Sequence, residues 1–478
     1  MLFNSFEFIF LFLPIVFVLY FILNKVNFKL SKGWLLVASL FFYGWWNPAY
    51  LPLILSSLFV NFGLGTYLSK RKFTRFRKTV LTLGIIFNVC LLGYFKYYDF
   101  VVGNLNAVIG AEFEILNLLL PLAISFYTFQ QIAYLVDSYR YETERYSFLN
   151  YSLFVTFFPQ LIAGPIVQHS DTIPQFADKR NHRLNFTNIR LGLFIFAVGL
   201  FKKVVLADNF AIWANRGYGS ADSLTFIDSW VTSLSYTFQL YFDFSGYTDM
   251  AIGAALLFNI VLPINFNSPY KALDIQDFWR RWHITLSGFL TKYIYIPLGG
   301  NRRGPFMTYV NIFIIFFISG IWHGAGWTFI LWGVLHGLAS IVARMWKKAG
   351  FSMPKLLAWF ITFQFVNATW VFFRAISIDQ ALQVLKAMTG LNGVVLPEQL
   401  AAFMPESLPY AAFNLEENLL YLLFMLLAGT VIALFAKNSI QLKDEMKPTA
   451  FNVVFVSVLL LFCFTQLTKV SEFLYFNF

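Results

Sequence analysis

The stretch FEFIFLFLPIVFVLYFILN, residues 6–24, is long and apolar enough to cross a membrane as one helix. Similar runs recur along the chain, for example NVVFVSVLLLFCFTQL at 452–467. The 478 residues are 58% hydrophobic and 12% charged, which leaves too little polar surface to cover a soluble globule. The sequence therefore predicts an all-α integral membrane protein. The first run lacks a basic segment before it and a small-residue cleavage site after it, so we expect a retained span.

Hydropathy predicts roughly 11–13 helices that cross the membrane or re-enter it. The number depends on 150–167 and 229–262, which can be broken or re-entrant where protein or water satisfies the backbone. Neither an internal repeat nor a long linker divides the chain, so residues 1–478 are expected to form one polytopic domain. The predicted spans lie near 6–24, 33–47, 50–69, 79–98, 115–137, 190–207, 229–262, 308–322, 325–345, 356–375, 418–436 and 450–467.

Clusters of lysine and arginine in short loops indicate the orientation of the spans, because such loops stay in the cytoplasm. The net charge of +11 is explained by these loops and does not require a nucleic-acid partner. The acidic segments around 112–114 and 376–417, and an aromatic tail at 468–478, are then expected on the outer side. The predicted cytoplasmic residues are Lys25, Lys29, Lys32, Lys70, Arg71, Lys72, Arg75, Arg77, Lys78, Arg344, Lys347, Lys348, Lys437, Lys443 and Lys447.

Residues able to carry chemistry concentrate between about 159 and 337. One basic stretch, DIQDFWRRWHITLSGFLTKYIYIPLGGNRRG at 274–304, mixes arginines with aromatic residues on a predicted cytoplasmic face. Paired glycines beside arginines allow close backbone approach to a phosphate, which favours an anionic ligand. The alternative is an interfacial segment that lies on anionic lipid headgroups. The candidate ligand-binding residues are Arg280, Arg281, Arg302 and Arg303.

His323 lies among apolar and small residues in ISGIWHGAGWTFILWGVLHG, residues 318–337. From a cytoplasmic helix start near 308, a rise of 1.5 Å per residue places it about 22 Å into the membrane. An ionisable side chain at that depth indicates function, and a neutral imidazole suits a general base. The alternative is a structural histidine bonded to a carbonyl. His283 is a second catalytic candidate, whereas His336 is expected to pack and His169 and His182 to lie in loops without a catalytic role.

Asp243, Ser245 and Asp249 lie in the apolar span QLYFDFSGYTDMAIG, residues 239–253. Carboxylates are costly in lipid, so they should face the protein interior and have partners there. They could orient a histidine, hold an arginine or bind substrate amides, and the pattern leaves these three roles open. Cys90 and Cys463 lie within predicted spans, so neither a disulfide nor a cysteine metal site is expected.

Five segments together resemble the membrane-bound O-acyltransferase family, in its bacterial branch of alginate and peptidoglycan O-acetyltransferases. The resemblance extends over nearly the whole chain and implies a core of about 115–375 around a central tunnel. An acyl group is then expected to pass from a cytoplasmic thioester, across the bacterial cytoplasmic membrane, to an acceptor outside. The segments are RRWHITLSGFLTKYIYIPLGGNRRG, GIWHGAGWTFILWGVLHG, YFDFSGYTDMAIG, FFPQLIAGPI and the opening MLFNSFEFIFLFLP.

The resemblance also implies roles for particular residues. His323 is the expected base that takes a proton from an acceptor hydroxyl, and His283 or a neighbouring donor is expected to stabilise the oxyanion or the CoA end. The donor is expected to be acetyl-CoA, with its phosphates on the basic stretch and no bound cofactor. The family's Trp-His-Gly motif matches Trp322, His323 and Gly324, and its Arg-Trp-His motif matches Arg281, Trp282 and His283.

The acceptor implied by the resemblance is an exported envelope polysaccharide, reached through an esterase-like extracytoplasmic acetyltransferase partner. The run FFPQLIAGPIVQHSDTIPQF, residues 157–176, is more similar to the peptidoglycan members. A polytopic transporter or flippase without acyl chemistry is the alternative, but many secondary transporters show a repeat symmetry that this chain lacks. A scaffold for polymer assembly is a third hypothesis.

The tail SEFLYFNF, residues 471–478, has two interpretations. One is an aromatic collar at the membrane surface. The other comes from resemblance to the C-terminal motif of a small partner in the sister D-alanyl-transferring branch, which contains an acyl-accepting tyrosine. On that interpretation Tyr475 receives the acetyl group with help from His323 and passes it on.

Overall fold

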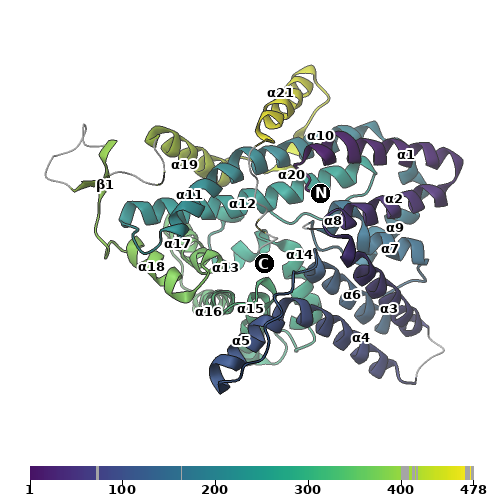
Figure 1. The fold of residues 1–478 in the computed structure, drawn as a ribbon, viewed down its shortest axis with the longest axis horizontal. Coiled ribbons are helices and arrows are strands. Elements are labelled where there is room, and N and C mark those ends of the chain that lie inside the picture. Colours follow the sequence, from purple (N-terminus) through teal and green to yellow (C-terminus); the bar gives the residue numbers. More distant parts are fainter. Residues whose placement is uncertain are drawn as a thin grey trace.

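The structure is a computed structural model that describes residues 1–478 except 71–74, 163, 400–408, 412–414, 416–417, 469–473 and 475–478. The described chain is mainly helical (Figure 1). Its described strands, Leu396–Pro397 (β1) and Tyr410–Ala411 (β2), form one short parallel pair. The predicted all-α fold is confirmed.

Helices follow one another along the described chain, with longer connections at 110–123, 258–268 and 389–418. The α-helices are α1 (Leu13–Val26), α2 (Phe28–Gly44), α3 (Leu51–Ser69), α4 (Arg77–Leu92), α5 (Tyr98–Ile109), α6 (Ile124–Tyr139), α7 (Phe148–Thr156), α8 (Phe158–Leu161), α9 (His169–Ala177), α10 (Phe186–Phe201), α11 (Asp208–Gly219), α12 (Phe226–Leu257), α13 (Ile275–Arg281), α14 (Ile284–Leu290), α15 (Gly304–His323), α16 (Trp327–Lys348), α17 (Lys355–Arg374), α18 (Ile378–Met388), α19 (Leu419–Leu434), α20 (Ser439–Glu445) and α21 (Ala450–Gln466). Shorter π or 3-10 turns are η1 (Glu7–Phe12), η2 (Pro48–Tyr50), η3 (Gly93–Tyr97), η4 (Lys179–His182), η5 (Lys202–Ala207), η6 (Pro269–Lys271) and η7 (Thr291–Tyr295).

Several helices have the length and hydropathy of a membrane span, so the chain is a multi-pass membrane protein. Among the described residues there are six, or seven if α19 and α20, which meet at 63°, form one bent span. Other apolar segments also form helices, but α2, α6, α10, α19 and α21 are 17 residues or shorter. The six are Glu7–Val26, Pro48–Ser69, Arg77–Ile109, Gly304–His323, Trp327–Lys348 and Lys355–Arg374.

The longest helix, α12, runs through the middle of the molecule (Figure 1). Thr225 caps its first turn, and the Asp228 carboxylate accepts a hydrogen bond from the Thr225 backbone N–H in return. Nearly every residue from 229 to 257 is buried. Because α10, α11, α17 and α18 all pack against it, α12 does not form a lipid-facing span of the ordinary kind.

Glycines bring α10 and α12 into backbone contact. A Cβ added to Gly253 would lie 2.6 Å from the carbonyl oxygen of Gly192. A Cβ added to Gly246 would lie 2.8 Å from that of Gly199. Small residues commonly allow such close approach between helices in membranes. These two pairs therefore fix how α10 lies along α12.

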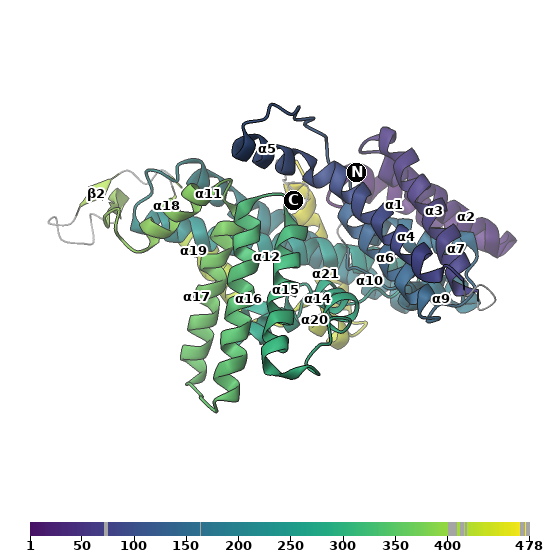
Figure 2. The same ribbon diagram turned by 90° about the horizontal axis from the view of Figure 1, so that it is seen from below.

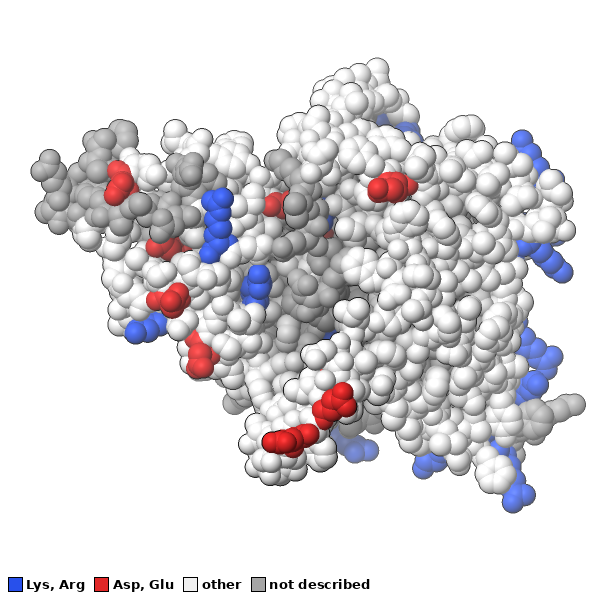
Figure 3. Space-filling view, viewed as in Figure 1, with Lys and Arg blue, Asp and Glu red and all other residues white. Residues whose placement is uncertain are grey.

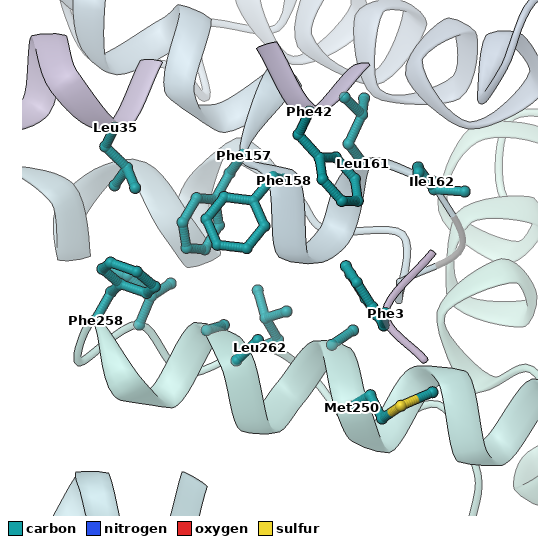
Figure 4. Close-up of a cluster of buried hydrophobic side chains, with 14 of the residues drawn as sticks. Phe3, Leu35, Phe42, Phe157, Phe158, Leu161, Ile162, Met250, Phe258 and Leu262 are labelled. Atoms are coloured by element: carbon teal, nitrogen blue, oxygen red, sulfur yellow. The ribbon is translucent and has the colours of Figure 1, made fainter. Parts of the chain in front are cut away.

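Aromatic side chains join α12 to the N-terminal helices. Phe158 contacts Phe12 edge-on with ring centroids 5.1 Å apart, and contacts Phe258, after α12, at 5.8 Å. Phe3 stacks on Tyr247 of α12 at 4.5 Å. Figure 4 shows Phe3, Phe158 and Phe258 gathered beside α12. Each aromatic pair adds about 1 kcal/mol beyond its buried area, so the N-terminal segment is held firmly on the central helix.

Two charged segments mark opposite ends of the helices α15, α16 and α17. In Figure 2, α15, α16 and α17 stand side by side, with the α16–α17 connection at the lower end and α5 at the upper end. Lys347 and Lys348 end α16, whereas Glu112 and Glu114 follow α5. On the face shown in Figure 3, acidic side chains lie across the surface and lysines and arginines gather mainly along the right and lower edges. The side of the membrane that each end faces stays a prediction.

Gly253→Ala is expected to lower the thermal stability of the purified protein by about 1–3 kcal/mol, because the new methyl group meets backbone atoms of α10. The matched control is Gly103→Ala in α5, where no atom lies within 4 Å of the added Cβ. Alanine is favoured over glycine there by helix propensity. Thermal unfolding midpoints in detergent measure both effects, and equal midpoints for the two variants would contradict the close packing.

Candidate active site

Two histidines from different segments meet inside the molecule. His323 is the last residue of α15, and His283 lies in the turn between α13 and α14. The two residues are 4% and 0% exposed, and their ring centroids are 6.4 Å apart. The fold therefore brings together the two histidines that sequence motifs identified separately.

The imidazole of His323 is enclosed but unpaired. Neither ring nitrogen has a hydrogen-bond partner within the described part of the chain. The ring instead contacts Trp322, Trp332 and Phe373, with centroids between 4.9 and 5.1 Å away. Other buried side-chain atoms of the described residues also lack partners, but His323 is the histidine with both ring nitrogens unpaired there. His323 is thus available to exchange a proton with a group from outside the protein.

Unlike His323, His336 has hydrogen-bond partners for both ring nitrogens. Its Nδ1 accepts a hydrogen bond from the indole of Trp279 at 3.2 Å, so in the neutral ring Nε2 carries the hydrogen. Nε2 donates to the hydroxyl of Thr369 at 3.0 Å, and that hydroxyl donates to the Val366 carbonyl at 2.9 Å. Every polar atom of His336 is satisfied, which supports the interpretation that it has a packing role.

Lys96 and Tyr97, in the π turn η3, hold the end of α15 that carries His323. The Lys96 ammonium donates to the carbonyls of Trp322 and His323 at 2.6 and 3.1 Å. The Tyr97 hydroxyl donates to the Ile321 carbonyl at 2.8 Å. The last carbonyls of a helix lack internal partners and carry partial negative charge, which favours a cation there. Lys96 was not among the predicted site residues, although a lysine in the predicted span 79–98 was a signal of the same kind as His323.

Aromatic residues form the walls around the two histidines. Trp322 stacks on Phe129 with an interplanar angle of 14° and a centroid distance of 5.1 Å. Trp282 stacks on Phe278 at 15° and 5.7 Å, and also contacts Trp370. Both tryptophans of the predicted motifs are buried, so they shape the site through packing.

Asp243 on α12 joins two other segments. It forms an ion pair with Lys203 at 2.7 Å, and its second oxygen accepts a hydrogen bond from the backbone N–H of Leu474 at 3.3 Å. Leu474 is 2% exposed and packs in the core cluster that includes Phe244 and Trp282. Tyr475, the predicted acyl carrier, lies outside the described residues. The residue that precedes it is therefore buried against α12.

Asp249 also has a lysine partner. Its carboxylate pairs with Lys202 at 2.7 Å and accepts a hydrogen bond from Ser439, on α20, at 2.8 Å. Ser245 is buried, and its hydroxyl has no partner among the described residues. Of the roles left open for the two carboxylates, pairing with a cation is the one the structure contains, with lysine in place of arginine. A substrate-binding role for Asp243, Ser245 and Asp249 stays a prediction.

The four arginines of the basic stretch lie in different surroundings. Arg280 and Arg344, from α13 and α16, line one cavity of about 290 Å³. Arg281 pairs with Asp277 at 3.0 Å, and Arg302 and Arg303 are exposed just before α15. The other residues that line the cavity are Gln276, Trp279, Thr291, Tyr295, Ile312, Ile315, Phe316 and Ser340.

An ion pair joins the start of α13 to the end of α16, the two helices that contribute Arg280 and Arg344 to this cavity. Asp274 caps α13 and pairs with Lys347 at 2.8 Å. Burial alone would raise the pKa of Asp274, but hydrogen bonds from Lys347 and from two backbone N–H groups outweigh it and hold that pKa below its ordinary value. The carboxylate is therefore charged at neutral pH and keeps α13 beside α16.

A second polar cluster lies around His169, which is not in a loop as expected but is the first residue of α9 and 1% exposed. Its Nε2 donates to Asp137 at 2.9 Å, and Nδ1 bonds to the Tyr146 hydroxyl at 2.9 Å. Asp137 also accepts hydrogen bonds from Lys292 at 3.0 Å and Tyr293 at 2.7 Å. The cluster thus ties α6 and α9 to η7, within the basic stretch.

The fold and the site define a multi-pass, all-α membrane protein that encloses a pair of histidines. A family model described as "MBOAT, membrane-bound O-acyltransferase family" matches residues 135–379. The chain is 50% identical to the peptidoglycan O-acetyltransferase of Helicobacter pylori, over 100% of this chain and 98% of that protein. Probable alginate O-acetylases of Azotobacter vinelandii and Pseudomonas aeruginosa are 41% and 40% identical, each over 81% of this chain and over 78% and 75% of their own.

The chain therefore belongs to the membrane-bound O-acyltransferase family and is an acyltransferase. The resemblance predicted from its sequence motifs is confirmed. The matched range, 135–379, contains both histidines as well as the lysine-paired carboxylates of α12.

Lys96→Met is expected to lower thermal stability by about 1–3 kcal/mol, because it leaves the carbonyls of Trp322 and His323 without their donor. It should also reduce acyl transfer, since the end of α15 that positions His323 loses its anchor. Lys78→Met, an exposed lysine on α4, is the matched control and should change neither property. Unfolding midpoints and thioester turnover on the same samples measure both, and a Lys96→Met protein that behaves like the control would contradict the role of Lys96.

Proposed function

We propose that this protein transfers acetyl groups from a cytoplasmic acetyl thioester, acetyl-CoA, across the bacterial inner membrane for O-acetylation of an envelope polysaccharide. Among polysaccharides, a peptidoglycan-type acceptor is favoured over alginate, because the relative that is 50% identical acts on peptidoglycan by name and aligns over the full chain. The observation that carries the proposal is the buried His323 imidazole, unpaired within the described residues and 6.4 Å from His283.

The proposed chemistry is acyl transfer assisted by a base. The acceptor hydroxyl attacks the thioester carbonyl while His323 takes its proton, because a neutral hydroxyl is a poor nucleophile. The intermediate then expels the CoA thiolate, the C–S bond breaks, and the ester C–O bond remains. The proton on His323 passes to the thiolate, which restores the neutral imidazole. The aromatic walls exclude water, which limits hydrolysis of the thioester.

The donor is proposed to bind on the side where the basic stretch lies. Arg280 and Arg344 provide two guanidinium groups at one cavity, and guanidinium groups suit phosphate oxygens. The cavity includes Ile315 of α15, eight residues before His323, which corresponds to about 12 Å along the helix. A thioester whose phosphates lie at the arginines would thus direct its acyl end along α15 toward the histidines.

The acceptor side is proposed to use the C-terminal tail. Tyr475 is the first acceptor hydroxyl and receives the acetyl group as an aryl ester. A nucleophile of an esterase-like extracytoplasmic acetyltransferase then attacks the ester carbonyl, and the tyrosine leaves and regains its proton. A phenoxide is a better leaving group than a sugar alkoxide, so a tyrosine ester suits a relay. This step is supported by Leu474, whose burial beside Asp243 puts the preceding residue of the tail within the core. The C-terminus is accordingly proposed to lie outside the cytoplasm.

His323→Gln is expected to lower acetyl transfer by about 10²-fold or more, the scale of general-base catalysis. The measurement is release of free CoA thiol from acetyl-CoA by purified protein with an acceptor glycan and the partner acetyltransferase. His182→Gln, a partly exposed histidine bonded to Asn24, is the matched control and should retain the activity. Full transfer by His323→Gln at unchanged protein level would overturn the assignment. A transporter would release no thiol even in the unaltered protein, and a scaffold would tolerate both substitutions.

Tyr475→Phe is expected to abolish glycan acetylation while the protein level stays normal. Mass spectrometry of the C-terminal peptide after incubation with acetyl-CoA should detect acetyl on Tyr475 in the unaltered protein. Tyr94→Phe, an exposed tyrosine, serves as the control. Normal glycan acetylation by Tyr475→Phe would leave only the aromatic collar as a role for the tail.

A further inference from the structure

Asn265 lies in the segment between α12 and α13 and is 1% exposed. Its side-chain oxygen accepts hydrogen bonds from the backbone N–H of Thr285 at 3.2 Å and from the Thr285 hydroxyl at 2.9 Å. A backbone N–H can only donate, so the atom at this position is the amide oxygen and not the nitrogen. The same oxygen lies 3.1 Å from Nδ1 of His283.

The identity of that oxygen determines which tautomer His283 adopts. Because an amide oxygen only accepts, Nδ1 of His283 must carry the hydrogen. A neutral imidazole has one hydrogen, so Nε2 carries a lone pair. Nε2 is buried and has no partner within the described residues. Neutral His283 can thus accept a hydrogen bond or a proton at Nε2, but it cannot donate one there to an oxyanion.

We propose that Asn265 is a positioning residue that fixes His283 as the Nδ1–H tautomer, with Nε2 as a proton acceptor facing the acyl-transfer site. This inference rests on the proposed function and changes the role expected for His283. His283 takes up a hydrogen bond from the acceptor hydroxyl, or from His323 once that ring is protonated. When a proton moves from O–H or N–H to Nε2, it passes on to the departing CoA thiolate, which restores the neutral ring, and the Nδ1–H bond to Asn265 stays intact throughout.

Asn265 also forms hydrogen bonds to the backbone next to His283. His283 has φ 44° and ψ 53°, a left-handed conformation that is uncommon for residues other than glycine. The next residue, Ile284, donates its N–H to the Asn265 carbonyl at 3.0 Å. The Thr285 hydroxyl accepts a hydrogen bond from the Ile166 N–H at 3.0 Å. Strained residues persist where their surroundings determine them, and they concentrate at functional sites.

Within the described residues, the ring contacts of His283 include no charged side chain, so its tautomer is assigned from Asn265. The ring contacts Phe244, Trp322 and His323, of which only His323 can titrate. Lys96 is directed at the carbonyls of Trp322 and His323. Asp243, next to Phe244 in the chain, is paired with Lys203. The sole described hydrogen bond to the His283 side chain is therefore the one to Asn265.

The test is nitrogen NMR on full-length protein labelled at histidine, in which His283→Gln identifies the signal of His283. The expected spectrum of the unaltered protein has hydrogen on Nδ1 and a lone pair on Nε2. Asn265→Leu should lose this preference and lower acetyl transfer by about 10²-fold. Asn265→Asp, which keeps an acceptor oxygen, should retain the tautomer and most of the activity, and it is the variant to use if Asn265→Leu does not fold.

The matched control is Asn367→Leu, because Asn367 is also a buried acceptor, of two hydroxyl groups from Ser233 and Thr237. It should lower stability without changing the His283 tautomer. Hydrogen on Nε2 in the unaltered protein would overturn the inference, as would Asn265→Leu with an unchanged tautomer and rate. The spectrum does not depend on turnover, so an Nδ1–H tautomer together with full activity of His323→Gln would refute the proposed function alone.

Discussion

The contact between the Lys96 ammonium and the last carbonyls of α15 is the interaction on which the site depends. A helix that ends inside a membrane leaves carbonyl groups without partners, and lipid supplies none. Lys96 and Tyr97 satisfy the carbonyls of residues 321–323, so α15 can end in the core with a defined geometry. The side chain at this end, His323, is left with both ring nitrogens unpaired among the described residues. The role proposed for His323 as the base in acyl transfer requires this combination of bonded backbone carbonyls and unpaired ring nitrogens.

The buried carboxylates of α12 also have partners within the protein. Lys202 and Lys203, adjacent in the π turn η5, pair with Asp249 and Asp243. Removing one partner of a buried ion pair leaves an uncompensated charge, which costs about 3–5 kcal/mol. The pairs therefore fix the register between η5 and α12, while Ser439 and Leu474 attach the C-terminal region to the same carboxylates. In this way the central helix links the N-terminal half, the histidine pair and the last helices.

The fold class, the family and the two histidines could be predicted from the sequence, because single residues and local motifs indicate them. Contacts between distant segments could not. His323 and His283 stand out as ionisable residues within apolar or motif-bearing segments, whereas their 6.4 Å separation depends on tertiary packing. Lys96 lies inside a predicted span, but its partners at the end of α15 are distant in sequence, and Asn265 resembles a loop asparagine because its partners are also contributed by another segment. The segment 229–262 was predicted as a span from its length and apolar residues, but α12 is not among the helices with the mean hydropathy of a span, and it is enclosed by other helices.

The central claim is that an acetyl group, and not its carrier, crosses the membrane through the histidine-containing core. The direct measurement uses proteoliposomes with oriented protein, acetyl-CoA labelled in its acetyl group on the cytoplasmic side, and acceptor glycan with its partner acetyltransferase on the other side. The account predicts labelled acetyl on the glycan and free CoA thiol only on the cytoplasmic side. Intact acetyl-CoA or free CoA thiol appearing on the glycan side would contradict it.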